Sequence, residues 1–334
     1  MNRIILYTTL TIAAVTPFAM HGEDSTENLN RFSFGPRFGL NFKADFHNSA
    51  PYFNAVNPGL AAGGLNHTYD DGYVRVDSSG NAGGRTWNWG YQNGSQVVGD
   101  AMQFHAIKPR SSSSATDDPQ YGAELIYQRV IGTMPFLPSV RWGLEAGFSF
   151  TDLDLRNNRN GTVPVTTDTF PLNGVLPPGA GYNGNFTGPG ALLGDTPTRT
   201  TTSATMTSNQ KLSGQLFNIR LGPFAEWNFT HQLSLAASVG LTLAPASVDY
   251  DFSETVSLTG GGTYAASGHS SKNELLYGPY VSAMLRYDFN QRWGVYVGAQ
   301  FQSLTDLEQS IGHRTARLDQ GATVYGTAGI SYRF

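Results

Sequence analysis

Residues 324–334 read Val-Tyr-Gly-Thr-Ala-Gly-Ile-Ser-Tyr-Arg-Phe, and this stretch decides the fold. Every second residue from Val324 to Phe334 is apolar or small, and the residues between them include Thr327, Ser331 and Arg333. Because side chains alternate between the two faces of a strand, a period of two predicts one apolar and one polar face. A barrel closed in a lipid bilayer needs such strands, apolar outside, polar inside and aromatic at the water interface. The segment therefore predicts the closing strand of a transmembrane barrel.

The composition agrees with a β-rich protein. Only 14% of the 334 residues are charged, whereas 39 are glycine and 12% are aromatic. These values suit a chain of strands and turns better than a helical enzyme. The net charge of -4 gives no basis for nucleic-acid binding. The chain has no cysteine, which excludes disulfides and thiolate metal sites.

The N-terminus predicts export. Asn2 and Arg3 form a short basic start, and residues 4–20 are mostly apolar. We expect a signal peptide over residues 1–22, with Ala19 and Gly22 as candidate cleavage positions. A membrane-anchoring helix is the alternative. No later run of about 20 apolar residues follows, so the sequence favours a barrel in the bacterial outer membrane over a helical membrane protein.

Seven earlier segments show the same alternation of apolar and polar residues as the last one. The connections between successive strands are alternately long and short. This asymmetry is typical of outer-membrane barrels, with short periplasmic turns and long external loops. We predict an all-β fold, an eight-stranded antiparallel up-and-down transmembrane barrel over residues 31–334, with a soluble barrel as the alternative. The other strands are expected at 31–46, 121–131, 140–151, 212–229, 233–243, 275–289 and 293–301. External loops are expected at about 47–119, 153–211, 252–273 and 305–321, of which 153–211 is interpreted as a long mobile loop.

The aromatic residues form two predicted girdles. If the short turns are periplasmic, aromatic residues gather at both ends of the strands, as a bilayer requires. The periplasmic set is Phe32, Trp142, Trp227, Phe229, Tyr287, Phe289, Trp293, Tyr332 and Phe334, and the external set is Phe42, Phe46, Tyr121, Phe148, Phe150 and Phe301.

The polar faces of the strands carry charges of both signs. Eight strands leave an interior just wide enough for side chains to fill, and an unpaired buried charge is costly. We therefore expect a barrel interior closed by a network of paired charges, with a small water-filled pore as the alternative. The expected members are Arg37, Glu124, Arg141, Glu145, Arg220, Glu226, Arg286, Asp288 and Arg333.

Motifs for catalysis or metal binding are weak. The sequence contains no P-loop and no HExxH motif. The spacing of Asp70, Asp71 and Asp77 misses the EF-hand calcium pattern. No histidine is expected on a strand beside a serine and an acid, as a barrel hydrolase would need. We predict no enzyme, cofactor or metal site. The histidines, all expected in the signal peptide, loops or turns, are His21, His47, His67, His105, His231, His269 and His313.

The first long loop contains a predicted hairpin with aromatic residues. Trp87, Trp89 and Tyr91 would share one face of it. One hypothesis is a surface patch that binds a glycan or a partner protein through aromatic contacts. The alternative is that these rings pack against the loop's own hairpin.

With its strands laid out, the chain resembles the small eight-stranded outer-membrane proteins of Gram-negative bacteria, the OmpA, OmpX and OmpW type. The resemblance implies that Ile330, Tyr332 and Phe334 act as the signal read by the barrel-assembly machinery. Because the chain ends on Phe334, we expect no periplasmic peptidoglycan-binding domain.

The sequence favours a structural or surface-interaction role, adhesin-like, through the external loops. A small-solute channel is the second hypothesis and a lipid-modifying barrel enzyme the third. The expected partners are outer-membrane lipid, the barrel-assembly machinery and a glycan or protein ligand at the loops, and no nucleic acid.

Overall fold

The computed structural model describes residues 29–48, 65–76, 83–107, 112–116, 119–185, 188–258, 262–312 and 314–334. The predicted signal peptide, residues 1–22, lies outside these ranges. Nearly all of the described elements are strands, with one short 3₁₀ turn at Gly94–Gln96. Within the described ranges, no helix has the length and apolar character needed to cross a membrane.

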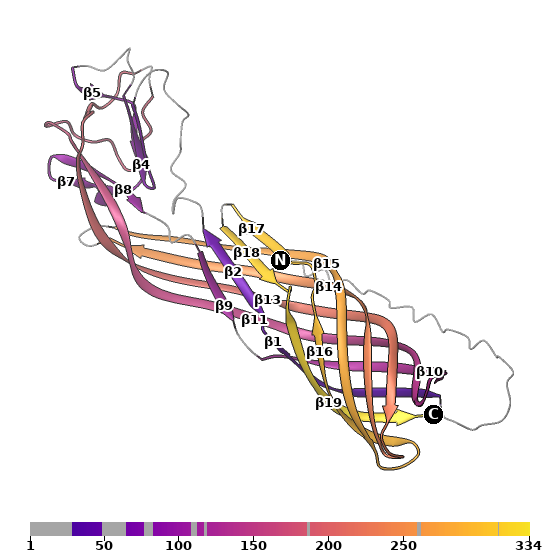
Figure 1. Ribbon diagram of the computed structural model, residues 1–334. Helices are drawn as coiled ribbons and strands as arrows, with labels where there is room; N and C mark the ends of the chain where they lie inside the picture. The colour runs from indigo at the N-terminus through magenta and orange to yellow at the C-terminus, as the bar shows by residue number, and fades with distance from the viewer. Residues whose placement is uncertain are drawn as a thin grey trace, which may run out of the picture.

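Eight antiparallel strands close into a ring, which confirms the predicted fold (Figure 1). The hydrogen-bonded order is β10-β1-β19-β16-β15-β14-β13-β11, and a further pairing of β10 with β11 closes the circle. The bounds are β1 Asn30–Leu40, β10 Gln120–Met134, β11 Leu137–Pro171, β13 Thr198–Asn228, β14 Leu233–Ser257, β15 Thr263–Asp288, β16 Trp293–Gln302 and β19 Thr323–Arg333.

The C-terminal strand closes the ring as its alternation predicted. β19 pairs with β1, where Phe34 lies opposite Ile330, and with β16, where Val295 lies opposite the same residue. Ile330 is 51% exposed on the outer face, whereas the neighbouring Ser331 is buried in the interior. Phe334 stacks on Phe32 with a centroid distance of 5.5 Å, on the outer face.

The outer face of the ring is apolar on all sides. Each strand presents alternate exposed residues, such as Leu221 on β13, Val239 on β14 and Val297 on β16. About ten residues per strand carry this pattern, the length that a tilted strand needs to cross a bilayer. A closed ring that leaves no free edge and faces lipid is a transmembrane barrel. The protein is accordingly an integral barrel of the bacterial outer membrane.

The prediction of one continuous first strand over residues 31–46 is wrong. This segment is divided into β1 and β2 (Lys43–Asn48), and the external-girdle residues Phe42 and Phe46 are fully buried rather than facing lipid. Asn41 separates the two strands with a φ of 64°, in the left-handed region. This residue turns the backbone, so that even-numbered positions face outward before Asn41 and inward after it.

Four strands continue far beyond the lipid-facing zone, so the interpretation of 153–211 as a long mobile loop is wrong over 153–171 and 198–211, where β11 and β13 continue. β11 contains 35 residues and β13 contains 31, and they remain paired from Val140–Trp227 to Thr169–Thr198. β14 and β15 likewise extend through most of the loop expected at 252–273. Along β11 the inward residues change from polar, such as Glu145 and Ser149, to apolar at Leu153 and Leu155.

A second sheet covers the inner face of these extensions. Its order is β17-β18-β2-β9, with β17 at Leu307–Ile311, β18 at Arg314–Asp319 and β9 at Ser112–Thr116. The hairpin of β17 and β18 lies in the loop expected at 305–321. The two sheets form a sandwich on the external side of the barrel, built around an apolar core. That core includes Phe42, Phe46, Leu153, Leu155, Leu212, Leu216, Val248, Tyr250, Leu276, Leu307 and Leu318.

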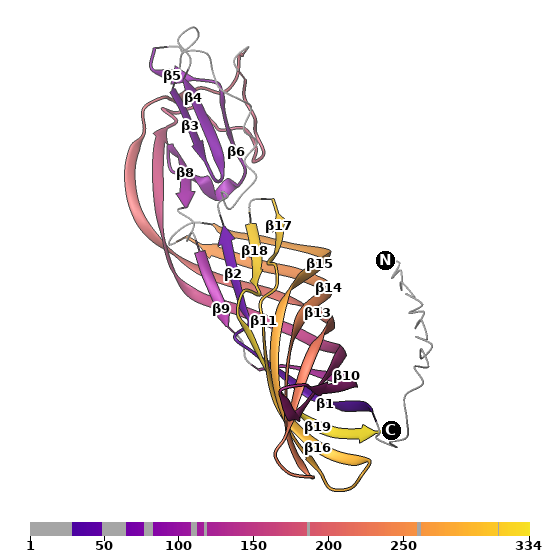
Figure 2. The same cartoon turned by 45° about the vertical axis from the view of Figure 1, so that its right-hand side comes forward.

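A third part, which we call the head, forms at the far ends of β11 and β13 (Figure 2). β8 (Ala101–Ile107) pairs with the free edge of β11, and β7 (Val97–Val98) pairs with β8. A small sheet of β3 (Leu65–Tyr69), β4 (Gly72–Val76) and β6 (Trp89–Tyr91) packs here, and β5 (Arg85–Thr86) pairs with β12 (Leu193–Gly194). The head's apolar core contains Tyr69, Val74, Trp89, Tyr91, Met102, Phe104, Phe170, Leu172 and Leu193.

Candidate functional site: a charged lumen and an external head

Glu226 on β13 holds three arginines in the periplasmic half of the lumen. Its carboxylate oxygens lie 2.8 Å from Arg31, 3.1 Å from Arg141 and 3.4 Å from Arg286. These arginines come from β1, β11 and β15, strands on different sides of the ring. Arg286 also donates to the amide oxygen of Gln128 on β10. The cluster therefore connects strands across the lumen.

Asp288 extends this cluster toward the periplasmic opening. It lies 3.1 Å from Arg31 and 2.7 Å from Arg333, so the first and last strands share one acid. The exposed fractions of these side chains, 13% for Asp288 and 23% for Arg333, place the pair at the edge of the lumen.

Glu124 and Glu145 hold the external half. Arg220 lies 3.5 Å from Glu124 and 3.2 Å from Glu145, and Arg37 lies 3.6 Å from Glu124. The Arg37 guanidinium also stacks 3.5 Å from the centroid of the Tyr325 ring, which favours a cation through the electron-rich ring face. All these side chains are at most 4% exposed.

The structure places all nine residues of the expected network in the lumen and pairs each of them. Arg31 is the charged member that the expected set missed. Its signal was present, because Arg31 shares the polar face of the first strand with Arg37. Uncharged partners were also missed, and these are Gln128, Ser149, Ser238, Tyr280, Tyr296, Gln300 and Gln302.

The aromatic surface patch is wrong for two of its three residues. Trp89 and Tyr91 are buried in the head core, with their rings stacked at a centroid distance of 5.7 Å. Trp89 Nε1 donates to the carbonyl of Ala191 at 2.8 Å. Trp87 is partly exposed. The rings pack within the head because Tyr182 and Ala191 contact Trp89 and Pro178 contacts Tyr91, and no local pattern encodes these contacts.

The aspartates considered for calcium fix the β3–β4 hairpin onto β8. Asp71 accepts the His105 backbone N–H at 2.8 Å, and its second oxygen lies 2.6 Å from His105 Nδ1. Asp70 accepts the Ile107 backbone N–H at 2.5 Å. Asp77 lies outside the described residues. In the part of the chain that the structure describes, no three His, Cys, Asp or Glu side chains gather as a metal site.

Asp168 is a further buried carboxylate. It lies where the head joins the paired extensions of β11 and β13, which we call the stalk. Asp168 accepts two hydrogen bonds from Arg199, each of 2.7 Å, and one from the Tyr69 hydroxyl at 2.6 Å. The hydrogen bonds from Arg199, opposed by burial, lower the pKa of Asp168. Burial and the hydrogen bond to Asp168 raise the pKa of Tyr69.

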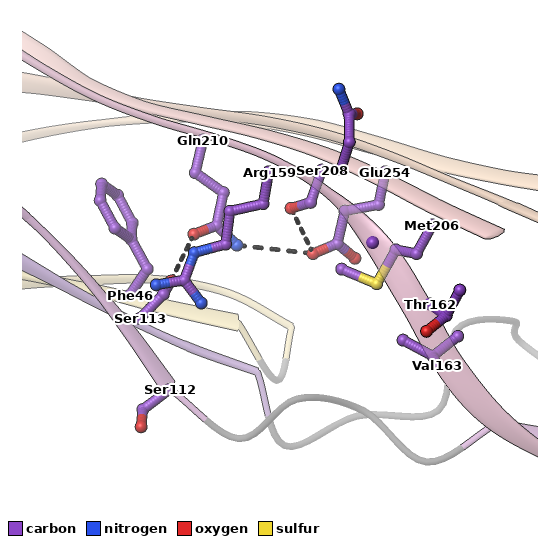
Figure 3. Close-up of a pocket in the computed structure, with 12 residues that line it drawn as sticks. Phe46, Ser112, Ser113, Arg159, Thr162, Val163, Met206, Ser208, Gln210 and Glu254 are labelled. Carbon is purple, nitrogen blue, oxygen red and sulfur yellow. Dashed lines mark hydrogen bonds between the residues drawn. The ribbon is translucent and has the colours of Figure 1, made fainter.

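The external sandwich encloses a small polar cavity between β9 and the stalk strands (Figure 3). Ser208 and Gln210 donate to Glu254 at 3.3 and 3.4 Å, and Arg314 holds the same carboxylate at 2.9 Å. The cavity volume is about 30 Å³, enough for one or two waters rather than a ligand. It therefore serves the packing of the two sheets.

Four histidines expected in loops lie on strands, and these are His47 on β2, His67 on β3, His105 on β8 and His269 on β15. His269 was expected in a loop, but it lies on the outer face of β15, beside Asp251 of β14 and Ser271 of its own strand. Residues 252–273 have the composition of a loop, with three consecutive glycines. For this reason the sequence did not predict that the strands extend into this range.

Comparison with known proteins finds likeness to solved barrels only. No protein-family model matches the chain, and no curated protein sequence matches it. It is similar to Ail, the attachment invasion locus protein of Yersinia pestis, at 9% identity and a TM-score of 0.28, over 91% of this chain and 99% of that one. It is similar to the outer membrane protein OprG from Pseudomonas aeruginosa at 11% identity and a TM-score of 0.30, over 91% and 96%. It is similar to the outer membrane protease OmpT from Escherichia coli at 9% identity and a TM-score of 0.30, over 94% of this chain and 99% of that one.

Proposed function

We propose that this protein is a closed outer-membrane barrel that displays a folded head outside the cell for binding a glycan or a protein. The observation that carries the proposal is the continuity of β11 and β13, which run from a lumen filled with ion pairs to a head with its own core. Closure and display are separate parts of this proposal, and each is tested separately.

Closure is supported by the geometry of the charges. Two acids, Glu124 and Glu145, and two arginines, Arg37 and Arg220, occupy the external half of the lumen at contact distance. Side chains of this size fill the interior of an eight-stranded barrel. A solute would have to separate buried ion pairs to pass, at a cost of several kcal/mol for each pair.

Display is supported by the length of the stalk. From the end of the lipid-facing zone near Thr151 to Thr169, β11 continues for eighteen residues in register with β13. At about 3.3 Å per residue this corresponds to roughly 60 Å of strand. The head therefore lies well outside the lipid, where a large ligand can reach it.

Conductance in a planar bilayer tests closure. The full chain is expected to show no large, steady conductance, whereas a variant with Glu124→Ala and Arg220→Ala should conduct measurably because its lumen is emptied of two large side chains. Large, steady conductance of the unaltered protein would overturn closure and favour the small-solute channel.

Binding of displaying cells to arrays of immobilised glycans and extracellular-matrix proteins tests the head. Trp89→Ala removes a fully buried ring from the head core, a change that typically costs 3–5 kcal/mol. It should abolish binding while the barrel keeps its heat-modifiable migration on a gel. Trp142→Ala on the lipid face is the matched control and should leave binding intact. Binding that survives collapse of the head would contradict display.

A further inference from the structure

The outer face of the external sandwich, on the extensions of β11, β13, β14 and β15, carries a transverse row of polar side chains that the proposed function does not use. Successive strands place Arg156, Lys211, Asp251 and His269 directly opposite one another. These four residues line an open groove of about 540 Å³. The rest of the lining is mostly uncharged and polar, at Asn158, Asn209, Gln210, Ser253 and Ser267, and it also includes Phe252 and Gly268.

Three residues in and beside this groove form a continuous hydrogen-bonded chain. Asp251 Oδ1 lies 2.7 Å from His269 Nδ1, and His269 Nε2 lies 3.2 Å from the hydroxyl of Ser271. Both histidine nitrogens are therefore engaged, one by an acid and the other by an alcohol. This is the order of contacts in which a carboxylate orients an imidazole that can take a proton from a serine hydroxyl.

The pairing of two strands, rather than a loop, fixes the relative positions of these three residues. Asp251 is directly opposite His269 in the β14–β15 ladder, and Asp249 is directly opposite Ser271. His269 and Ser271 are two residues apart on one strand, so their side chains point to the same face.

We propose that Asp251, His269 and Ser271 form a hydrolytic site for carboxylic esters of a polar, hydroxyl-rich alcohol such as an acylated sugar. The groove lining suits this class, because its amide and hydroxyl side chains match sugar hydroxyls, and its one apolar side chain, Phe252, is largely buried. The site also lies six residues beyond Leu275, the last large exposed apolar residue of β15, or roughly 20 Å along the strand. This inference is independent of head binding.

The reaction proceeds in two balanced halves. The Ser271 oxygen attacks the ester carbonyl carbon while His269 Nε2 takes the hydroxyl proton, and the carbonyl electron pair moves onto its oxygen. The intermediate collapses, the alkoxide leaves with the proton from His269, and an acyl-serine remains. Water then attacks the acyl-serine, His269 takes its proton and returns it to the Ser271 oxygen, and a carboxylic acid is released.

The neighbouring charges suit these steps. Asp251 accepts the Nδ1–H of His269 and stabilises the imidazolium that forms. The hydrogen bond to Asp251 raises the pKa of His269, with a further contribution from Asp249. Ester hydrolysis should therefore increase with pH through a midpoint above about 6.5, the ordinary histidine value.

Labelling with a fluorophosphonate, a probe for activated serines, tests the relay in the full chain refolded in detergent. The label should be found on Ser271 by peptide mass spectrometry and should disappear in Ser271→Ala. Ser247→Ala is the matched control, because Ser247 is an outward-facing serine of the neighbouring strand β14 that does not line the groove. This variant should keep the label.

Hydrolysis of p-nitrophenyl acetate tests the roles of the other two residues. His269→Gln should lower the rate on the order of 10²–10⁴-fold, the usual contribution of a general base, and should remove the pH midpoint. Asp251→Asn should lower the rate and move the midpoint to lower pH, because the hydrogen bond to Asp251 raises the pKa of His269. Heat-modifiable migration checks that each variant is folded. Release of acetate from an acetylated sugar supports the substrate class. Absence of labelling, labelling indifferent to Ser271→Ala, or release of fatty acid from phospholipid vesicles instead would overturn the proposal.

Discussion

The membrane-spanning barrel and the external sandwich share the strands β11, β13, β14 and β15, yet their interiors are opposite. In the barrel the inward side chains are charged, as at Glu145 and Arg220, whereas in the sandwich they are apolar, as at Leu155 and Leu212. The outward side chains are apolar on the barrel and polar on the sandwich. The surrounding solvent, lipid or water, therefore decides which face of one continuous strand is apolar.

The largest expected effect comes from removing the acid at the centre of the periplasmic cluster. Glu226→Ala leaves Arg31, Arg141 and Arg286 without their shared carboxylate, and breaking a buried pair in this way costs about 3–5 kcal/mol. The free energy of unfolding, measured by urea titration in micelles, should fall by that amount. Asp154→Ala, which breaks an exposed pair with Arg156, is the control and should cost no more than about 1 kcal/mol. Equal effects would mean that the buried cluster around Glu226 contributes no more to stability than an exposed ion pair.

An outward charge locates the boundary between lipid and water on a single strand. Val239→Arg places a cation near the middle of the lipid-facing zone and should destabilise the barrel by about 2–4 kcal/mol. Ser247→Arg, on the same face of β14 eight residues further along, should change stability by less than about 0.5 kcal/mol. Refolding into lipid vesicles measures both. Similar losses would mean that the bilayer extends over the external sandwich.

A smaller, pH-dependent effect is expected where the head joins the stalk. The pKa of Asp168 is lower in the folded protein than in the unfolded chain, chiefly because Arg199 donates hydrogen bonds to it. Its stabilisation is therefore present above the unfolded value of about 3.9 and is lost as the pH falls through the lower folded value. Asp168→Asn should weaken protection of the head amides from hydrogen exchange by about 1–3 kcal/mol at pH 7. Lowering the pH should then reduce the protection of the head amides more in the unaltered protein than in the variant. An equal reduction in both would exclude this role for Asp168.

The alternation of residues located all eight barrel strands, but it failed in two opposite ways at the boundary. Along β11, apolar residues move from even positions such as Phe148 to odd positions such as Leu153. A rule based on a fixed period interprets this change as the end of a strand, although the strand continues and only the solvent changes. Across Asn41 the alternation is unbroken while the backbone turns, so Phe42 faces inward.

The sites were predictable to the extent that strand faces encode them. The lumen charges follow from which face each strand turns inward, and Arg31 could have been found by the same rule as Arg37. The burial of Trp89 depends on Ala191, a residue distant in sequence, and the pairing of Asp251 with His269 depends on the register of the β14–β15 hairpin. Composition indicated loops in these places because threonine, asparagine and glycine are common both in loops and in water-exposed strands.

The unbroken ladder between β11 and β13 has a mechanical consequence. A ligand held by the head while the cell is carried away by flow would pull along the two strands toward the barrel. Both strands connect the barrel to the head, so their two covalent backbones share this load, and the hydrogen bonds perpendicular to them keep the strands side by side. From Thr169–Thr198 back to Val140–Trp227 the ladder has no gap in register, so the two backbones stay coupled along the whole of this length.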